Sequence, residues 1–104
     1  MDIFYTESFG PSVALISVKD DEEAIELAND TEYGLSGSVF TEDLRRGLRI
    51  AKAIDSGAVH INGMSVHDEA ALPHGGVKKS GWGRFNAQWG MEEFLKIKVV
   101  TYRE

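Results

Sequence analysis

The chain has 104 residues, which is long enough for one domain and too short for two. Its 42% hydrophobic and 27% charged residues are typical of a globular domain and exclude a disordered chain. The formal net charge of −6 argues against nucleic acid or an anionic membrane as a partner, because both require a positive surface. The 104 residues contain no cysteine, so they supply no disulfide, thiolate metal site or cysteine nucleophile.

No apolar run approaches the roughly 20 residues that a membrane span requires. The first ten residues lack the basic flank of a signal peptide, so we expect a cytoplasmic protein. A group of basic residues lies at helical spacing and is more simply a solvated helix face than an anion site: Arg45, Arg46, Arg49 and Lys52.

The first apolar run covers residues 13–18. It is short, rich in β-forming residues and preceded by Gly10-Pro11, so we expect a buried strand. Asp20 then offers an N-cap, and with Glu23 it has the spacing of a capping box. The apolar residues that follow predict a helix over residues 22–29.

Residues 38–40 predict a second short strand, and Thr41 is the expected cap of the next helix. That helix has an apolar stripe and should end at Ser56-Gly57, where Gly57 suits a left-handed C-terminal cap. Residues 58–62 predict a third strand. The order β-α-β-α-β with short connections indicates an α/β fold in which helices pack on a layered sheet.

Residues 63–89 show no sustained hydrophobic period and are rich in glycine. Such a long loop in a compact domain is usually functional or a docking surface. We expect a short helix over residues 91–96 and a β-branched strand over residues 97–102. The whole chain, residues 1–104, is treated as a single domain.

The glycine-rich loop over residues 75–84 does not complete a phosphate-binding motif. None of its glycines is followed directly by Lys and then Ser or Thr. Gly81-Trp82-Gly83 begins a dinucleotide fingerprint, but Asn86 stands where the third glycine belongs. Ser80 has no local base and lacks the nucleophile-elbow motif, so a serine hydrolase is not indicated.

Three histidines, His60, His67 and His74, are seven residues apart. Gly63 and Pro73 interrupt any helix that could align them, so no metal site is predicted. The carboxylates of residues 68 and 69 could form an acid–base cluster with His67, but solvated loop charges are the simpler explanation.

Five phrases occur in a fixed order along the chain: Glu7–Pro11, Leu27–Ser36, Val39–Thr41, Ser56–Asn62, and Pro73–Gly76 running into Ser80–Arg84. Together they resemble the C-terminal part of the NAD(P)-dependent aldehyde dehydrogenase superfamily. The resemblance covers essentially the whole chain but only the last part of a usual family member. Its closest likeness is to the branch that acts on aromatic aldehydes such as salicylaldehyde or vanillin, because of residues 66–69.

The resemblance implies roles for four residues. Glu7 would hydrogen-bond the hydroxyls of the nicotinamide ribose, and Phe9 would pack beside the nicotinamide. The alternative is that Glu7 is a solvent-exposed acid and Phe9 a core residue at a strand entry. His67 and His74 would lie near the aldehyde tunnel, where His74 replaces a phenylalanine that is common in the family.

In the family a cysteine thiolate attacks the aldehyde, and the resulting thiohemiacetal passes hydride to NAD or NADP. A glutamate then activates water, and an asparagine helps to hold the oxyanion. These groups and the cofactor domain lie N-terminal to the matched region, and Asn62 matches a different motif. The resemblance therefore implies no catalytic residue here, no tight cofactor binding and no activity for this chain alone.

A second hypothesis is a stand-alone assembly or regulatory module. The strand over residues 97–104 resembles the family's oligomerisation arm, and an unpaired strand edge is a template for pairing. We therefore expect a homo-oligomer, or pairing with a full-length dehydrogenase, through the terminal strand or an exposed sheet edge.

Overall fold

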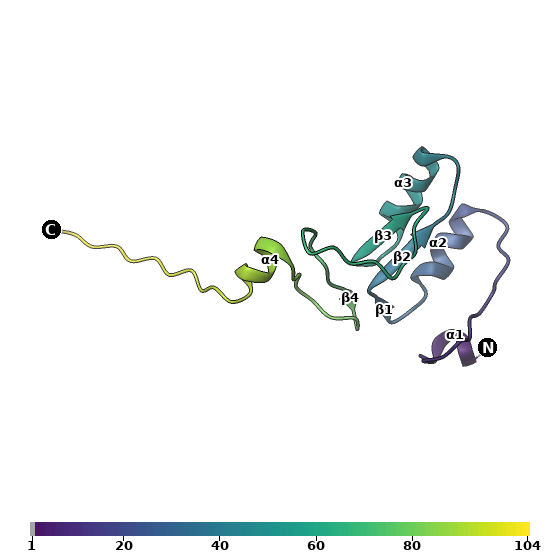
Figure 1. The fold of residues 1–104 in the computed structure, drawn as a ribbon, viewed down its shortest axis with the longest axis horizontal. Helices are drawn as coiled ribbons and strands as arrows, with labels where there is room; N and C mark the ends of the chain where they lie inside the picture. Colours follow the sequence, from purple (N-terminus) through teal and green to yellow (C-terminus); the bar gives the residue numbers. More distant parts are fainter. Residues whose placement is uncertain (1) are drawn as a thin grey trace.

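The computed structural model describes residues 2–104, so Met1, the first residue of the predicted domain, lies outside the described residues. Figure 1 shows the elements in chain order. The helices and strands are α1 (Asp2–Tyr5), α2 (Asp21–Asn29), β1 (Tyr33–Gly34), β2 (Ser36–Val39), α3 (Leu44–Ala53), β3 (Ala58–Ile61), β4 (Val77–Lys78) and α4 (Ala87–Glu92).

The centre of the fold is a β-α-β unit. Strands β2 and β3 are parallel, with Ser36 opposite Ala58 and Val39 opposite Ile61. Helix α3 connects them and packs on both, while α2 packs on α3 (Figure 1). Strands β1 and β4 form a separate antiparallel pair. The predicted α/β class is confirmed.

Helix α2 begins as its sequence predicts. The Asp20 carboxylate accepts a hydrogen bond from the Glu23 amide at 2.9 Å, which satisfies one of the free N–H groups of the first turn. The Glu23 carboxylate reaches back to the amide of Lys19 at 2.7 Å, one residue before the position that a capping box uses. The helix covers residues 21–29, one residue more than predicted.

Helix α3 differs from its prediction at both ends. Its N-cap is Asp43, whose carboxylate accepts from the amides of Arg45 and Arg46 at 2.9 and 3.1 Å. The Thr41 hydroxyl instead accepts from the amide of Asp43, so the prediction of Thr41 as cap was wrong by two residues. The helix ends at Ala53, and Gly57 is not among the glycines with positive φ, so it is not a left-handed cap.

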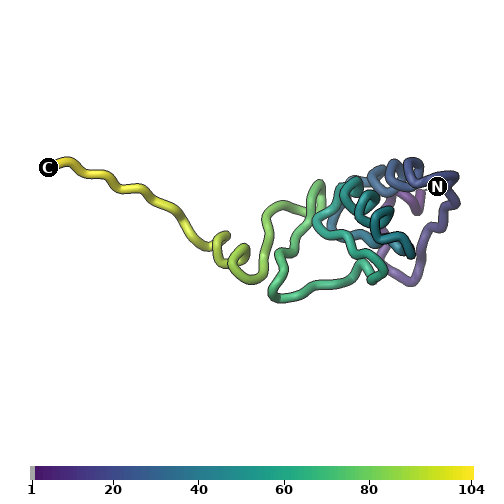
Figure 2. The backbone as a smooth tube through the Cα atoms, turned by 90° about the horizontal axis from the view of Figure 1, so that it is seen from above, coloured from purple at the N-terminus to yellow at the C-terminus, as the bar shows by residue number. Residues whose placement is uncertain are grey.

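The terminal apolar runs are extended but are not strands in this structure. No strand is assigned to residues 13–18 or 97–102 among the described residues. A strand requires hydrogen bonds to a neighbouring chain segment, and among the described residues neither run makes a backbone hydrogen bond to another segment. Figure 2 shows residues 97–104 projecting away from the body of the molecule. The last helix also forms earlier than predicted, over residues 87–92 and not 91–96.

The chain buries little of its apolar surface. Its radius of gyration is 18.2 Å and its extents are 70 × 32 × 24 Å, whereas a compact domain of this length has a radius of about 13 Å. The accessible surface is 8837 Å², against about 5,800 Å² for a compact monomer of 11.5 kDa. Within residues 2–104, Val39 is the one buried large hydrophobic residue.

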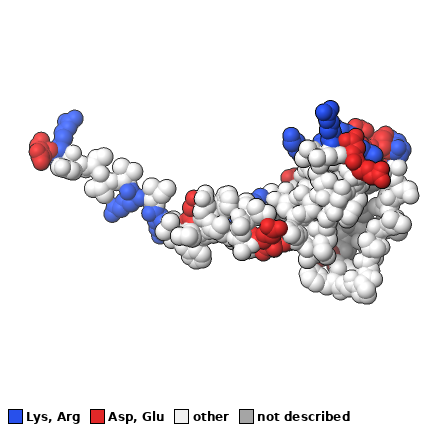
Figure 3. All heavy atoms as spheres, turned by 45° about the horizontal axis from the view of Figure 1, so that its top comes forward, with Lys and Arg blue, Asp and Glu red and all other residues white. Residues whose placement is uncertain are grey.

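Charged side chains are distributed unevenly. Figure 3 shows acidic and basic groups gathered at one end of the body, and most of the remaining visible face is uncharged. Ion pairs join α2 to α3, where Asp21 contacts Arg46 and Arg49. The described part of the chain has no helix with the length and apolarity needed to cross a membrane.

Candidate functional site

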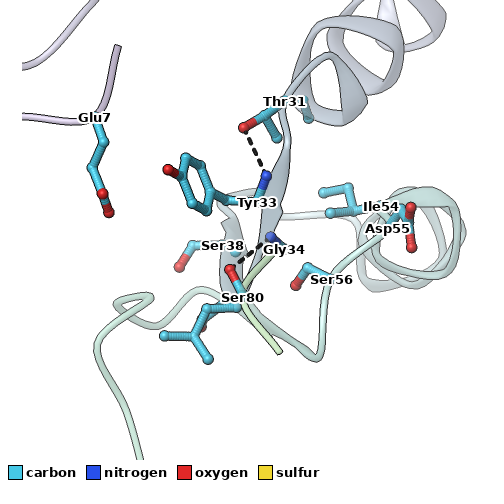
Figure 4. A pocket seen from close by; sticks show the side chains of 13 residues that line it. Glu7, Thr31, Tyr33, Gly34, Ser38, Ile54, Asp55, Ser56 and Ser80 are labelled. Atoms are coloured by element: carbon cyan, nitrogen blue, oxygen red, sulfur yellow. Dashed lines mark hydrogen bonds between the residues drawn. The ribbon is translucent and has the colours of Figure 1, made fainter. Parts of the chain in front are cut away.

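The first candidate site is an open hollow of about 440 Å³ between the N-terminal arm and the strands β1 and β2. Glu7 lies on one side of it, and Tyr33, Ser38 and Ser80 lie on the other (Figure 4). The Ser80 hydroxyl accepts a hydrogen bond from the Gly34 amide at 3.0 Å, which holds the glycine-rich loop against β1. Ser80 therefore has a structural role, and no feature of the sequence predicted its hydrogen bond with Gly34.

The N-terminal arm, residues 6–18, carries both predicted cofactor residues. Glu7 lines the hollow, whereas Phe9 is 96% exposed and does not. The arm is held at its ends, where the Tyr5 hydroxyl donates to Asp30 at 3.0 Å and the amide of Lys19 donates to Glu23. Because its hydrogen bond stabilises the protonated form, the Asp30 carboxylate raises the pKa of Tyr5. Among the described residues, residues 7–18 form no hydrogen bond to the rest of the chain.

The second candidate site is a hollow of about 350 Å³ that contains both predicted tunnel histidines. It is lined by Leu35, Ser36, Ser65, Val66, His67, Asp68 and His74. The Ser36 hydroxyl donates to the carbonyl oxygen of Ser65 at 2.5 Å and so joins the loop to the start of β2. The structure thus brings His67 and His74 together, although seven residues separate them.

His67 is held from two directions. Its Nε2 lies 2.9 Å from a carboxylate oxygen of Glu69, and its ring meets the His60 ring edge-on with centroids 5.1 Å apart. An ionised carboxylate only accepts hydrogen bonds, so His67 Nε2 is the donor in this contact. Glu69 is thus paired, although it is half exposed and was predicted to be a solvated loop charge.

His74 is fixed mainly through its backbone and its ring. Its amide and carbonyl pair with those of Phe85, and the two rings meet edge-on at 5.2 Å. His74 Nδ1 lies 3.9 Å from Asp68, which is too long for a hydrogen bond. The Asp68 carboxylate instead accepts from the side-chain amide of Asn86 at 2.7 Å. The described residues contain no group of three or more histidine and acidic side chains that could hold a metal ion.

The glycine-rich loop folds on itself next to these hollows. The Arg84 guanidinium donates to the carbonyl oxygens of Gly76 and Gly83 at 3.1 and 2.6 Å. The third-glycine position of the incomplete dinucleotide fingerprint is held by Asn86, whose φ of 76° is left-handed. Because Arg84 binds two of its carbonyl oxygens, the loop is held in a fixed conformation beside the hollows.

The aldehyde dehydrogenase family profile matches residues 1–100. The chain belongs to this family. The resemblance predicted from the five phrases is therefore confirmed, although the chain spans only about a fifth of the length of the curated relatives it matches.

Several curated relatives are similar over 97% of this chain. A vanillin dehydrogenase of Pseudomonas sp. strain HR199 is 45% identical over 101 residues, which cover 21% of that relative. A salicylaldehyde dehydrogenase of Pseudomonas putida is 46% identical with the same coverage. A chloroplastic betaine aldehyde dehydrogenase of Atriplex hortensis is 50% identical, so overall identity does not select a substrate.

Solved structures agree in fold. A salicylaldehyde dehydrogenase of Pseudomonas putida, complexed with salicylaldehyde, superposes with a TM-score of 0.90 at 42% identity, covering 98% of this chain and 22% of that one. A betaine aldehyde dehydrogenase of Staphylococcus aureus in complex with NAD+ superposes with a TM-score of 0.81 at 42% identity, covering 86% and 18%. The chain therefore has the family's conformation over almost its whole length.

Proposed function

We propose that this chain is the C-terminal segment of a dehydrogenase that oxidises an aldehyde to a carboxylic acid with NAD or NADP, and that it has no such activity alone. The observation that carries the proposal is the unburied apolar surface. Leu15 is 94% exposed and Ile97 is 98% exposed, and the chain leaves about 3,000 Å² more surface accessible than a compact monomer does. Large hydrophobic side chains exposed in this number form a surface for contact with other protein.

The chemistry also requires groups from outside the chain. None of the 104 residues is a cysteine, so a thiolate nucleophile must come from elsewhere. The cofactor, when bound, supplies the hydride acceptor. Glu7 can accept hydrogen bonds from two ribose hydroxyls, and Phe9 offers a flat apolar face to the nicotinamide. Both lie in residues 7–18, which form no hydrogen bond to the rest of the described chain, so the chain alone would have to order this arm on binding and should bind the cofactor weakly.

His67 and His74 are proposed to line the aldehyde tunnel of the assembled enzyme. They share one hollow with the apolar side chains of Leu35 and Val66, a combination that suits a flat ring. We therefore propose an aromatic aldehyde as substrate, and the cytoplasm as the location that cell fractionation should find.

A hybrid enzyme tests this function. In the salicylaldehyde dehydrogenase of Pseudomonas putida, the segment that superposes on this chain is replaced by this chain. We expect the hybrid to form NADH from an aromatic aldehyde, whereas the isolated chain and the host without its segment should not. A correctly folded, NAD-binding hybrid that oxidises no aldehyde would contradict the proposal, as would activity of the isolated chain.

An assembly or regulatory module is the second candidate. The observation in its favour is the extended segment 97–102, where four apolar side chains are largely exposed: Ile97, Val99, Val100 and Tyr102. Such a segment can add a strand to the sheet edge of another copy or of a full-length dehydrogenase. Light scattering over a concentration series should then show a dimer or larger assembly. An antibody to the chain should detect a band near 11.5 kDa in source cells if the module exists, and a band several times heavier if the chain is part of an enzyme.

A further inference from the structure

Asn62 lies between strand β3 and the loop that carries His67 to the second candidate site. The chain has three asparagines, Asn29, Asn62 and Asn86, and only Asn62 is followed by a glycine. Because glycine has no side chain, its backbone nitrogen can approach a neighbouring group more closely than that of any other residue. Asn62-Gly63 is therefore the place in this chain where a backbone nitrogen can best attack an asparagine side chain.

We propose that Asn62 is a deamidation site and that its contact with Thr41 controls the rate of the reaction. The backbone nitrogen of Gly63 forms a bond to Cγ of Asn62, and the bond from Cγ to Nδ2 breaks. Nδ2 leaves as ammonia and takes the proton of the Gly63 amide with it. Water then opens the resulting succinimide ring, and attack at Cγ gives aspartate whereas attack at the backbone carbonyl carbon gives isoaspartate. The inference is independent of the proposed dehydrogenase activity.

The reacting groups are accessible in the folded chain. The Gly63 amide donates no hydrogen bond among the described residues. Asn62 is exposed to the water that the second step consumes. The surroundings of Gly63 are open, because the nearest heavy atom to a Cβ at this position would be in the His60 side chain at 3.6 Å. Burial therefore does not protect this pair of residues.

Two hydrogen bonds hold the Asn62 side chain in its present place. Oδ1 accepts from the Thr41 amide and Nδ2 donates to the Thr41 carbonyl oxygen, both at 2.8 Å. The attack makes the planar Cγ tetrahedral and expels Nδ2, so the bonds to Thr41 do not survive it. The net contribution of two such bonds lowers the reactive population about 10- to 100-fold. The fold therefore slows the reaction, and loss of the contact with Thr41 releases it.

Conversion of Asn62 would break the contact that now protects it. An aspartate carboxylate only accepts hydrogen bonds, so it can still bind the Thr41 amide but no longer donates to the Thr41 carbonyl oxygen. Isoaspartate also passes the main chain through the former side-chain carbon, which lengthens the backbone just after β3. Ser65, whose carbonyl oxygen accepts from the Ser36 hydroxyl at 2.5 Å, and His67 follow within a few residues. Deamidation should therefore displace one wall of the second candidate site.

Incubation of the hybrid dehydrogenase in native buffer and in guanidinium chloride tests the inference. Peptide mass spectrometry follows Asn62, with Asn29 and Asn86 as internal references, and chromatography separates the aspartate and isoaspartate products. In guanidinium chloride we expect Asn62 to convert faster than both references. In native buffer its conversion should be about 10- to 100-fold slower than in guanidinium chloride. Equal rates at Asn62 in the two conditions would overturn the control by the fold, and a reference that converts faster than Asn62 in guanidinium chloride would overturn the site.

A change at Gly63 tests the attacking nitrogen. Gly63→Ala hinders this nitrogen, and the added methyl group has room at 3.6 Å from the His60 side chain. Conversion of Asn62 should therefore be slower in both conditions, while the melting temperature stays close to that of the parent. An unchanged rate in guanidinium chloride would show that Gly63 is not the nucleophile.

A change at Thr41 tests the control. Thr41→Gly keeps both backbone groups that bind Asn62, but it removes the hydroxyl that accepts from the Asp43 amide at 3.1 Å and so loosens this backbone. Conversion of Asn62 should become faster in native buffer and stay the same in guanidinium chloride. Thr31→Gly is the matched control, because the Thr31 hydroxyl accepts from the Tyr33 amide at 3.2 Å and does not contact Asn62. Equal acceleration in the two variants, or none in either, would overturn the role of Thr41.

Failures of folding and of the proposed function are distinguishable from failure of this inference. Thr41→Ala replaces Thr41→Gly, with the same expected direction, if the glycine variant does not melt cooperatively. A folded hybrid that oxidises no aldehyde counts against the proposed function, and the rates at Asn62 are still measured in it. Asn62→Asp, which carries one of the two products, should melt at a lower temperature than the parent. An equal melting temperature would show that deamidation does not disturb the contact with Thr41.

Discussion

The carbonyl oxygen of Gly75 lies 1.7 Å from the position that a Cβ on Gly57 would occupy. The amide of Gly57 also donates to the carbonyl oxygen of Gly34 at 3.0 Å. Three segments that are distant in sequence thus meet backbone to backbone, at the start of β3, in β1 and at the beginning of the glycine-rich loop. This contact fixes the loop that carries His74 relative to the strands that line both hollows.

Gly57→Ala should therefore destabilise the segment strongly. The added methyl group collides with backbone, which cannot move aside as a flexible side chain can, so we expect a loss of about 3 kcal/mol or more. The melting temperature of the hybrid dehydrogenase measures the effect. Gly63→Ala is the matched control, because its Cβ would lie at an ordinary 3.6 Å from the His60 side chain. Equal melting temperatures for the two variants would contradict the close contact.

The elements that the sequence predicted correctly are specified by neighbouring residues. Asp20 caps α2 through Glu23, three residues away, and β2-α3-β3 follows from contiguous apolar patterns. The failures depend on distant residues. Residues 13–18 and 97–102 have strand-forming composition, but a strand also requires a partner that no local pattern reveals.

The candidate site shows the same division. The family resemblance alone predicted that His67 and His74 lie near the aldehyde tunnel, and the structure brings them to one hollow. Glu69 and His67 are only two residues apart, yet the sequence favoured a solvated charge for Glu69. Their hydrogen bond depends on side-chain geometry, which the sequence does not specify. The chain has 11 glycines, and nothing in the sequence distinguishes Gly57 and Gly75 from the others. Their close contact could therefore not be predicted from the sequence.

Asn62 has a structural role that explains the shift of the α3 cap. Its side-chain oxygen accepts from the amide of Thr41 and its side-chain nitrogen donates to the carbonyl of Thr41, both at 2.8 Å. These two bonds hold the chain after β2 extended, so the N-cap of α3 is Asp43 and not Thr41. Asn62 also has a φ of 56°, a left-handed conformation that Asn tolerates better than most residues.

Asn62→Ala should cost about 1–3 kcal/mol, because it removes both hydrogen bonds and strains the backbone. Asn62→Gly also loses both hydrogen bonds, but glycine adopts the positive φ without strain. Its loss of stability should therefore be smaller than that of Asn62→Ala and still measurable. Urea denaturation of the hybrid compares the two. Since the side-chain amide is occupied by Thr41, a variant that keeps its stability but loses only kcat would contradict this structural role.

Asp21 at the start of α2 makes the segment sensitive to acid. Hydrogen bonds from Arg46, together with the charge of Arg49, lower the pKa of Asp21 in the folded state. A lowered pKa means that the contribution to stability is complete above the unfolded value near 3.9, and that it is lost as pH falls below that value. Both arginines are about half exposed, so salt should also weaken the interaction.

Asp21→Asn should therefore lower the melting temperature of the hybrid at pH 7, and the difference from the parent should shrink as the pH is lowered from about 4 to about 3. Glu42→Gln serves as the control, with no difference that depends on pH in this range. A gap between Asp21→Asn and its parent that stays constant down to pH 3 would show that the charge of Asp21 is not what joins α2 to α3.

The segment over residues 97–102 should exchange its amide hydrogens rapidly in the isolated chain at low concentration. Its amides make no hydrogen bond among the described residues, so only water competes for them. In the hybrid the same amides should be protected, because the rest of the enzyme supplies a partner for the strand. Amide exchange followed by mass spectrometry measures both states, with the amides of α3 as the internal reference. Protection that appears as the concentration of the isolated chain rises would indicate strand pairing between copies, whereas protection in a dilute monomer would mean that the segment folds back on its own body.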